Sequence, residues 1–267
     1  MSKYQKAVGL AAGTLLLSLA TGVFNINNTV AEEVESNVTI EEISEGEDVT
    51  VGEAVTVRGE VEDLESGVSF FLENDQLFDE ERVLVINVSG ELLPISPDDE
   101  TRLQVTGEVA ALTIAEVERD YDITLNPEIY VEYQTQRVIL AQSIVLAPEI
   151  EEVAENPDLY YGQEIAVEGE IEAENDYTFV LEEDKLIADD NILIINATGQ
   201  PLPTEEEKVV LTGTVRPYIE AEFDRDYDLT WDLELKEQIE AEYTEKPVMV
   251  VDGIYPSAEE TGFLEGL

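Results

Sequence analysis

An internal repeat constrains this sequence more than any other feature. Residues 40–144 recur, with many substitutions, as residues 150–254. Insertions between the two copies are small and cancel along the chain. Glycines keep their places in both copies: Gly52 with Gly162, Gly59 with Gly169, Gly90 with Gly199 and Gly107 with Gly213. A pattern that is carried twice, with loops of different length, predicts two copies of one domain.

The repeat divides the 267 residues into a first domain at 40–146 and a second domain at 150–256. Each is long enough to bury a hydrophobic core of its own. The sequence Ala-Pro-Glu at 147–149 predicts a tight linker between them. Residues 32–39 are expected to form an N-terminal linker, and residues 257–267 a polar tail without a pattern.

Residues 1–31 have the features of a secretory signal peptide. Lys3 and Lys6 precede an apolar run that ends near Phe24, and small residues lead up to Ala31. A basic start, an apolar stretch and small residues at the cleavage site are the three parts of such a signal. We therefore expect cleavage near Ala31 and an exported protein, periplasmic or extracellular. Retention of the leader as an anchor is the alternative, whereas the mature chain is not expected to span a membrane.

The charge of the chain is strongly negative. It has 13 Lys and Arg against 63 Asp and Glu, which gives a net charge of −50. Such a field repels nucleic acid and anionic lipid. Since 43% of the residues are hydrophobic, the charge indicates an acidic coat on a folded core rather than disorder. The coat itself is typical of a protein that stays soluble in a saline medium.

The first strand of each domain has a clear alternating pattern. Val55, Val57 and Gly59 fall on one row, with polar residues between them, and residues 164–172 repeat the pattern around Gly169. Alternation with period two predicts a half-buried strand. A glycine on the inward row predicts a sharp bend that lets one strand serve two faces of a small barrel.

Four further strands are expected in each domain, and the last of them is expected to pair back onto the first. The fourth strand has a central glycine, Gly107 or Gly213. The predicted ranges are 69–73, 83–88, 101–109 and 137–146 in the first domain and 178–182, 192–197, 208–215 and 247–251 in the second.

The hydrophobic period changes between the fourth and fifth strands. Ile114, Val117 and Tyr121 have the spacing of a short helix, and Asn126 followed by Pro127 predicts the start of another. The second domain has the corresponding residues Ile219, Phe223 and Tyr227, and a helix-favouring stretch at 232–243. The fold class is therefore all-β: two tandem five-stranded OB-like barrels, with short helices between strands 4 and 5 of each. A β-sandwich is the runner-up, because alternation alone does not distinguish the two.

Several segments of the second domain resemble a known group of proteins. They are Pro157–Gly162, Val167–Ile171, Leu211–Tyr218, Arg225–Tyr227 and Lys246–Val248. Together they resemble the OB-like domain, here in tandem, of uncharacterised exported bacterial proteins of cyanobacterial type. The first domain lacks the Pro-x-x-Tyr-x-Gly opening. The resemblance implies an extracytoplasmic β-barrel module, and it carries no activity with it.

One polar motif, Arg-Asp-Tyr-Asp, is present in both copies. The structural interpretation is that Arg119 or Arg225 pairs with a neighbouring carboxylate where the helix ends, while Tyr121 or Tyr227 packs on the barrel. The alternative is that the motif binds a metal ion. The carboxylates that would then bind it are Asp120, Asp122, Asp226 and Asp228.

Calcium is the cofactor to consider, because it binds clusters of carboxylate oxygens. The loops 73–81 and 182–191 are acidic, but neither has the Asp-x-Asp-x-Asp-Gly spacing of a calcium loop. Solvated acidic loops are the simpler interpretation.

The residue types argue against an enzyme. The chain has no histidine and no cysteine, so the usual nucleophile and base pairs are absent, and a two-carboxylate mechanism of the glycosidase kind is the remaining alternative. The glutamate-rich outer strands also lack the cationic groove that oligonucleotides need. We therefore expect a non-enzymatic interaction or scaffold module whose partner is a protein or an envelope component. A calcium-binding protein that uses the acidic loops is the alternative.

Overall fold

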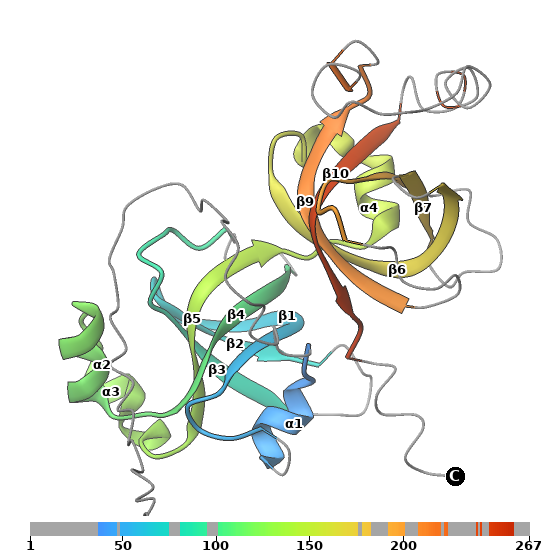
Figure 1. Cartoon of the computed structure of the whole chain (residues 1–267). Helices are drawn as coiled ribbons and strands as arrows, with labels where there is room; N and C mark the ends of the chain where they lie inside the picture. Colours follow the sequence, from blue (N-terminus) through green and yellow to red (C-terminus); the bar gives the residue numbers. More distant parts are fainter. Residues whose placement is uncertain are drawn as a thin grey trace, which may run out of the picture. The chain divides into compact units, whose positions relative to one another are not determined.

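The computed structural model describes most of the repeated region. The described residues belong to one compact unit, which consists mainly of strands with a few short helices (Figure 1). No helix in the described part of the chain is long and apolar enough to cross a bilayer. The described residues are 37–46, 49–74, 81–94, 101–175, 178–182, 192–200, 208–219, 222–223, 239, 241 and 246–258.

Five strands in the first half close into a barrel. Antiparallel pairs join β1 to β2, β2 to β3, β1 to β4 and β4 to β5. A parallel pair between β3 and β5 closes the ring, and this closure excludes the β-sandwich for this half. The strands are β1 (Ala54–Ser66), β2 (Ser69–Glu73), β3 (Arg82–Asn87), β4 (Arg102–Ala111) and β5 (Arg137–Leu146).

The expectation that the fifth strand pairs back onto the first is wrong. β5 pairs with β4 on one side and with β3 on the other. The reason lies in β1, which pairs with β4 through Ala54–Glu60 and with β2 from Glu60 onward. β4 thus takes the first part of β1 and β2 the second, and β5 joins the ring between β4 and β3 instead.

Gly59 allows β1 to change partners within one strand. A Cβ atom added there would lie 2.6 Å from the carbonyl oxygen of Glu73 and 2.8 Å from Cδ1 of Ile40. Only glycine leaves room for so close an approach. Its place on the inward row with Val55 and Val57, both buried, agrees with the bend that the sequence predicts. Gly169 has the equivalent place in the second half, opposite Val209.

Gly107 of β4 lies opposite a bulge in β5. A Cβ atom there would overlap the carbonyl of Leu140, and the pairing register shifts at this residue. Gly213 repeats the arrangement against the carbonyl of Val250, again beside a register shift. The central glycine of each fourth strand thus allows a close backbone approach.

Each half begins with a short helix that the sequence analysis did not assign. These are α1 (Ile40–Glu45) and α4 (Ile150–Glu155). Ile40 and Ile43 of α1 are buried in the barrel core. The start of α1 is a capping box, in which Thr39 and Glu42 exchange side-chain to backbone hydrogen bonds. This Thr-x-x-Glu pattern, followed by apolar residues at helical spacing, is the signal that could have revealed the helix.

The second half makes the same five kinds of strand pair. β6 pairs with β7 and β9, β7 with β8, and β9 with β10, all antiparallel, whereas β8 and β10 are parallel. Its buried residues form a separate core cluster. The strands are β6 (Glu164–Asn175), β7 (Thr178–Glu182), β8 (Ile192–Asn196), β9 (Lys208–Pro217) and β10 (Pro247–Pro256), and the short helix η2 (Pro157–Leu159) precedes β6.

The segment between β4 and β5 covers the outer face of the first barrel. It contains α2 (Ile114–Tyr121), α3 (Pro127–Tyr130) and the short helix η1 (Val131–Tyr133), which confirms the short helices expected in this half. Asn126 caps α3 by accepting a hydrogen bond from the backbone of Glu128, also as predicted. The apolar residues of this segment pack on Phe71, Leu84, Ile86, Val138 and Leu140 and form a second core outside the barrel.

The second half has a matching outer cluster. Tyr218, Phe223 and Ile239 pack on the outward side chains Val180, Leu193, Ile195 and Val248. The rings of Tyr218 and Phe223 stack with their centroids 5.6 Å apart. Tyr227 and most of the predicted helix at 232–243 lie outside the described residues.

The two halves meet at the end of β5. Leu146 pairs in parallel with Ile165 of β6. The side chain of Leu146 also packs against the core clusters of both halves. Ala147 of the expected linker is fully buried, so the linker is part of the contact between the halves.

Candidate functional site

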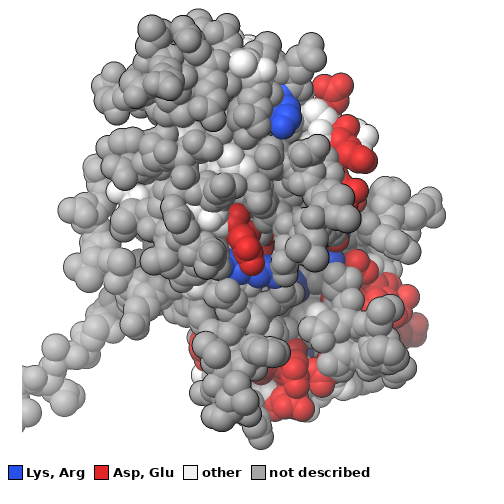
Figure 2. All heavy atoms as spheres, turned by 90° about the vertical axis from the view of Figure 1, so that its right-hand side faces the viewer, with Lys and Arg blue, Asp and Glu red and all other residues white. Residues whose placement is uncertain are grey.

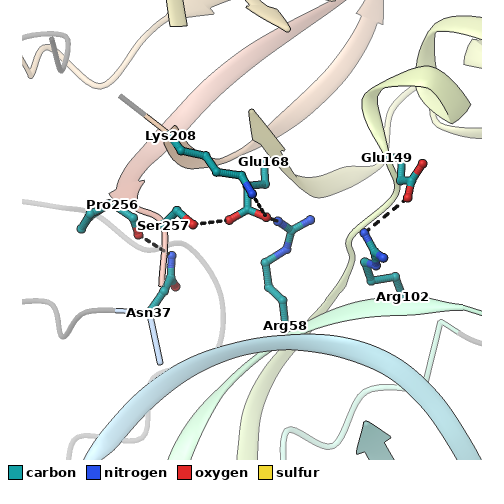
Figure 3. A network of polar contacts seen from close by, with 8 residues as sticks. All are labelled: Asn37, Arg58, Arg102, Glu149, Glu168, Lys208, Pro256 and Ser257. Carbon is teal, nitrogen blue, oxygen red and sulfur yellow. Dashed lines mark hydrogen bonds and ion pairs between the residues drawn. The ribbon is translucent and has the colours of Figure 1, made fainter. Parts of the chain in front are cut away.

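A network of polar contacts lies between the two halves, and we call it the junction (Figure 3). It draws on β1, β4, β6, β9, the linker and the segments that flank α1 and β10. Its members are Asn37, Arg58, Arg102, Glu149, Glu168, Lys208, Pro256 and Ser257.

Glu168 is at the centre of the junction. Its carboxylate lies 3.0 Å from Nη1 of Arg58 and 3.7 Å from Nζ of Lys208. It also accepts a hydrogen bond of 2.5 Å from the hydroxyl of Ser257. The side chains of Arg58 and Glu168 are only 14% and 18% exposed. A charge pair so well shielded from water is screened by salt much less than a surface pair.

A second set of contacts fixes the linker. Arg102 of β4 lies 3.6 Å from the carboxylate of Glu149, the N-terminal cap of α4. The carbonyl of the same arginine accepts a hydrogen bond of 2.9 Å from the backbone of Ala147. The start of the second half is therefore held to β4 of the first.

A third set of contacts joins the two ends of the repeated region. Asn37 donates a hydrogen bond of 3.0 Å to the carbonyl of Pro256 and forms a parallel bridge with Thr56 of β1. The next residue, Ser257, donates its backbone N–H to the carbonyl of Lys208 at 3.2 Å. Ser257 belongs to the segment predicted as a polar tail, yet its side chain is buried. Hydrogen bonding to Glu168 and Lys208 accounts for this, since a buried polar group needs partners.

An apolar cluster lies beside the charges. Ala147, Ala166 and Val210 are buried, and Val145 and Tyr255 pack against them. Among them, Ala166 is on the outward row of β6, where the sequence predicts solvent exposure. Contact between the halves covers it instead.

A small cavity lies at the edge of the junction. Its volume is about 80 Å³, and polar groups of Asn37, Thr39, Arg58, Asn74 and Glu168 line it. The cavity has room for a few water molecules. Pockets for cofactors or drug-sized ligands measure about 300–1,000 Å³. The cavity is therefore too small for a nucleotide or an oligosaccharide.

Basic side chains are visible at more than one place on the described surface. Figure 2 shows a short band of Lys and Arg near the middle of this face, with Asp and Glu directly beside it and along one edge. Arg58, Arg102 and Lys208 of the junction belong to the chain's 13 basic residues. Of these three, Arg58 and Arg102 form ion pairs that connect the two halves.

The first Arg-Asp-Tyr-Asp motif lies at the end of α2. Arg119 forms a bidentate pair with the adjacent Asp120, at 2.7 and 2.9 Å, and this pair lowers the pKa of the Asp120 carboxyl. Asp122 ends the helix in the left-handed conformation, with φ of 55°. Tyr121 packs against the outer cluster, and burial raises the pKa of its hydroxyl. The negative charge of Asp120 is therefore already balanced by Arg119, its neighbour in the chain.

Metal binding remains a prediction. Within the described residues, no three acidic side chains are grouped so that they could hold a metal ion. Arg225, Asp226 and Asp228 of the second motif lie outside those residues, as do most of the acidic loops at 73–81 and 182–191.

Acidic side chains of the two halves also repel each other near the junction. Burial raises the pKa of Glu164 at the start of β6, and the charges of Asp252 and Glu91 raise it further. Glu91 follows β3 in the first half, whereas the other two belong to the second. Ionised carboxylates at this place oppose the contact that the Arg58–Glu168 pair stabilises.

No protein-family model matches this chain. No curated protein matches it either. Sequence reasoning missed the junction, because it treated the outer row of each first strand as solvated. The signal was an arginine at position 58, on a row where the second copy has only Glu and Ala.

Proposed function

We propose that this chain is an exported, non-enzymatic interaction or scaffold protein built from two tandem OB-like barrels. The observation that carries the proposal is the covered outer face of β2 and β3. OB barrels bind oligonucleotides and oligosaccharides on this face. In the first half α2, α3 and η1 pack on it, and in the second half Tyr218 and Phe223 pack on the corresponding strands.

The same five kinds of strand pair in both halves support the tandem arrangement. Each half has its own core cluster and begins with a capped helix. Gly59 bends the first strand of the first half, and Gly169 has the equivalent position in the second. The resemblance to exported bacterial OB-like domains agrees with this proposal. The sequence of residues 1–31 supports export.

Charge and residue chemistry support the absence of catalysis and of nucleic-acid binding. A chain without histidine or cysteine lacks the commonest catalytic bases and nucleophiles. Its net charge of −50 repels a phosphate backbone. The junction uses Arg58, Arg102 and Lys208 internally, so these side chains are not arranged as a groove for an anionic polymer.

Binding through an extended outer surface fits these features best. The junction cavity, at about 80 Å³, is too small for a cofactor. An acidic surface steers a cationic partner toward it and makes association dependent on salt. We therefore propose a partner with a basic surface, either a protein or another component of the envelope.

Photo-cross-linking in the native envelope fraction tests this function. A photoreactive amino acid would replace Val131 or Leu159, which are 59% and 65% exposed and lie in η1 and η2. The expected result is one cross-linked component that, once purified, binds the whole chain saturably and more weakly as salt rises. Cross-links to nucleic acid, or no saturable binding at any ionic strength, would overturn the proposal.

A further inference from the structure

The junction pairs equivalent positions of the two repeats. Arg58 and Glu168, which are in contact, each precede the inward glycine of their strand, Gly59 or Gly169. Arg58 lies opposite Gln104 of the fourth strand, and Glu168 lies opposite the corresponding Val210. The same place in the repeat therefore occurs on both sides of the contact, with opposite charge.

Other junction residues show the same correspondence. Val145 and Tyr255 hold matching places in the last strands, and both belong to the apolar cluster. Ala147 and Ser257 follow those strands. Each donates its backbone N–H to the first residue of the neighbouring strand, Arg102 at 2.9 Å or Lys208 at 3.2 Å. One face of the repeat is thus used twice, once from each half.

We propose that the junction is a two-fold-like interface and that the charges of Arg58 and Glu168 determine which faces pair. The inference rests on the proposed tandem barrels. In a two-fold interface the same patch occurs on both sides, so a residue at its centre meets its own counterpart. Two arginines or two glutamates there would repel each other within a poorly solvated contact. An arginine on one face and a glutamate on the other therefore favour contact between the two different halves and disfavour contact between two copies of the same half.

The partner of each face is the other half of the same chain. Ala147 is fully buried and Leu146 pairs directly with Ile165, so the connection between the faces is short. At the opposite end, Asn37 contacts Pro256. A short connection gives the second face a high effective concentration, which favours pairing within one chain over pairing between chains.

Charge reversal in the whole chain tests the inference. Because the sequence has no cysteine, Val131→Cys and Leu159→Cys would place one spin label on each half for distance measurement by pulsed electron resonance. We expect a narrow distance distribution in the parent chain, a broad one in Arg58→Glu and in Glu168→Arg, and a narrow one again when both reversals are combined. Glu108→Arg makes the same change of charge on β4, outside the junction, and should leave the distribution narrow.

Mixing the two single variants adds a second readout. Arg58→Glu supplies two acidic faces and Glu168→Arg two basic ones, so the mixture should form a one-to-one complex by sedimentation, whereas neither variant alone should associate. The inference is overturned if the single variants stay narrow, if the double reversal stays broad, or if the mixture remains monomeric.

Hydrogen exchange on the same samples separates this inference from the proposed architecture. Protected amides in β6–β10 of the parent chain are expected from a second closed barrel. If those amides are unprotected even in the parent chain, the tandem-barrel proposal itself fails. If they are protected but charge reversal has no effect, only the role of Arg58 and Glu168 is refuted.

Discussion

Replacing Gly59 with alanine should destabilise the first barrel through a steric conflict. The added Cβ atom would lie 2.6 Å from the carbonyl oxygen of Glu73 and 2.8 Å from Cδ1 of Ile40. The carbonyl belongs to β2, which pairs with β1 on one side and with β3 on the other, so it has little freedom to move. The Ile40 side chain can rotate only within the packed core.

Two opposing effects determine the size of the change. Overpacking a core costs about 1–3 kcal/mol, and the upper half of this range applies because one neighbour is backbone. Alanine also restricts the unfolded chain, which returns about 0.4–1 kcal/mol. We expect a net loss of about 1–2.5 kcal/mol in the free energy of unfolding. With a urea dependence of about 2 kcal/mol per M, the midpoint falls by about 0.5–1.2 M.

Urea unfolding followed by circular dichroism measures this loss. Gly67→Ala is the matched control, because an added Cβ atom at Gly67 meets nothing within 4 Å, and it should be neutral or slightly stabilising. Adding Ile40→Val to Gly59→Ala removes the Cδ1 contact and should recover part of the loss, although Ile40→Val alone costs about 0.5–1.5 kcal/mol. Equal midpoints for Gly59→Ala and Gly67→Ala would refute the steric explanation.

Four further predictions follow from the described contacts and charges. Ser69→Ala removes the buried 2.7 Å hydrogen bond to the Tyr130 hydroxyl and should cost about 1–3 kcal/mol in unfolding free energy. Amide hydrogen exchange in α3 should become faster, and Tyr130→Phe, which removes the other partner of the same bond, should act in the same direction. Because the pKa of Glu164 is raised in the folded state, protonation of its carboxyl favours folding, and stability should rise as the pH falls through this pKa. Glu164→Gln should stabilise the chain at neutral pH and flatten that rise. The melting temperature should fall as salt is withdrawn, since the net charge of −50 is then less screened; no change would contradict the solvated acidic coat. Calorimetric titration with millimolar calcium in moderate salt should show no binding heat, whereas a saturable signal would support the metal-binding alternative.

Sequence patterns predicted most strands of the first barrel, either from alternation, as in β1, or from a short run of apolar residues, as in β3. Val55, Val57 and Gly59 point inward along β1, and period-two alternation is a local property that one strand shows by itself. The closing pair between β3 and β5 was not predictable in this way. Pairing is a relation between distant segments, and it depended on the bend at Gly59 that uses both edges of β1.

The junction was hidden for a related reason. Arg58 and Glu168 are on outward rows, and an outward polar residue has the same sequence pattern whether it meets water or another domain. Only the charge difference between the two copies distinguishes this position from its acidic neighbours. Comparing each position with its counterpart, rather than strand by strand, would have drawn attention to it.

Leu146 has a consequence for the order in which the chain is assembled. Its side chain packs against both cores, and its backbone pairs with Ile165. During synthesis from the N-terminus, the last strand of the first barrel therefore already carries Leu146, the residue against which the second half packs. A completed first barrel offers the later half a template, so vectorial folding should proceed with few misplaced strands.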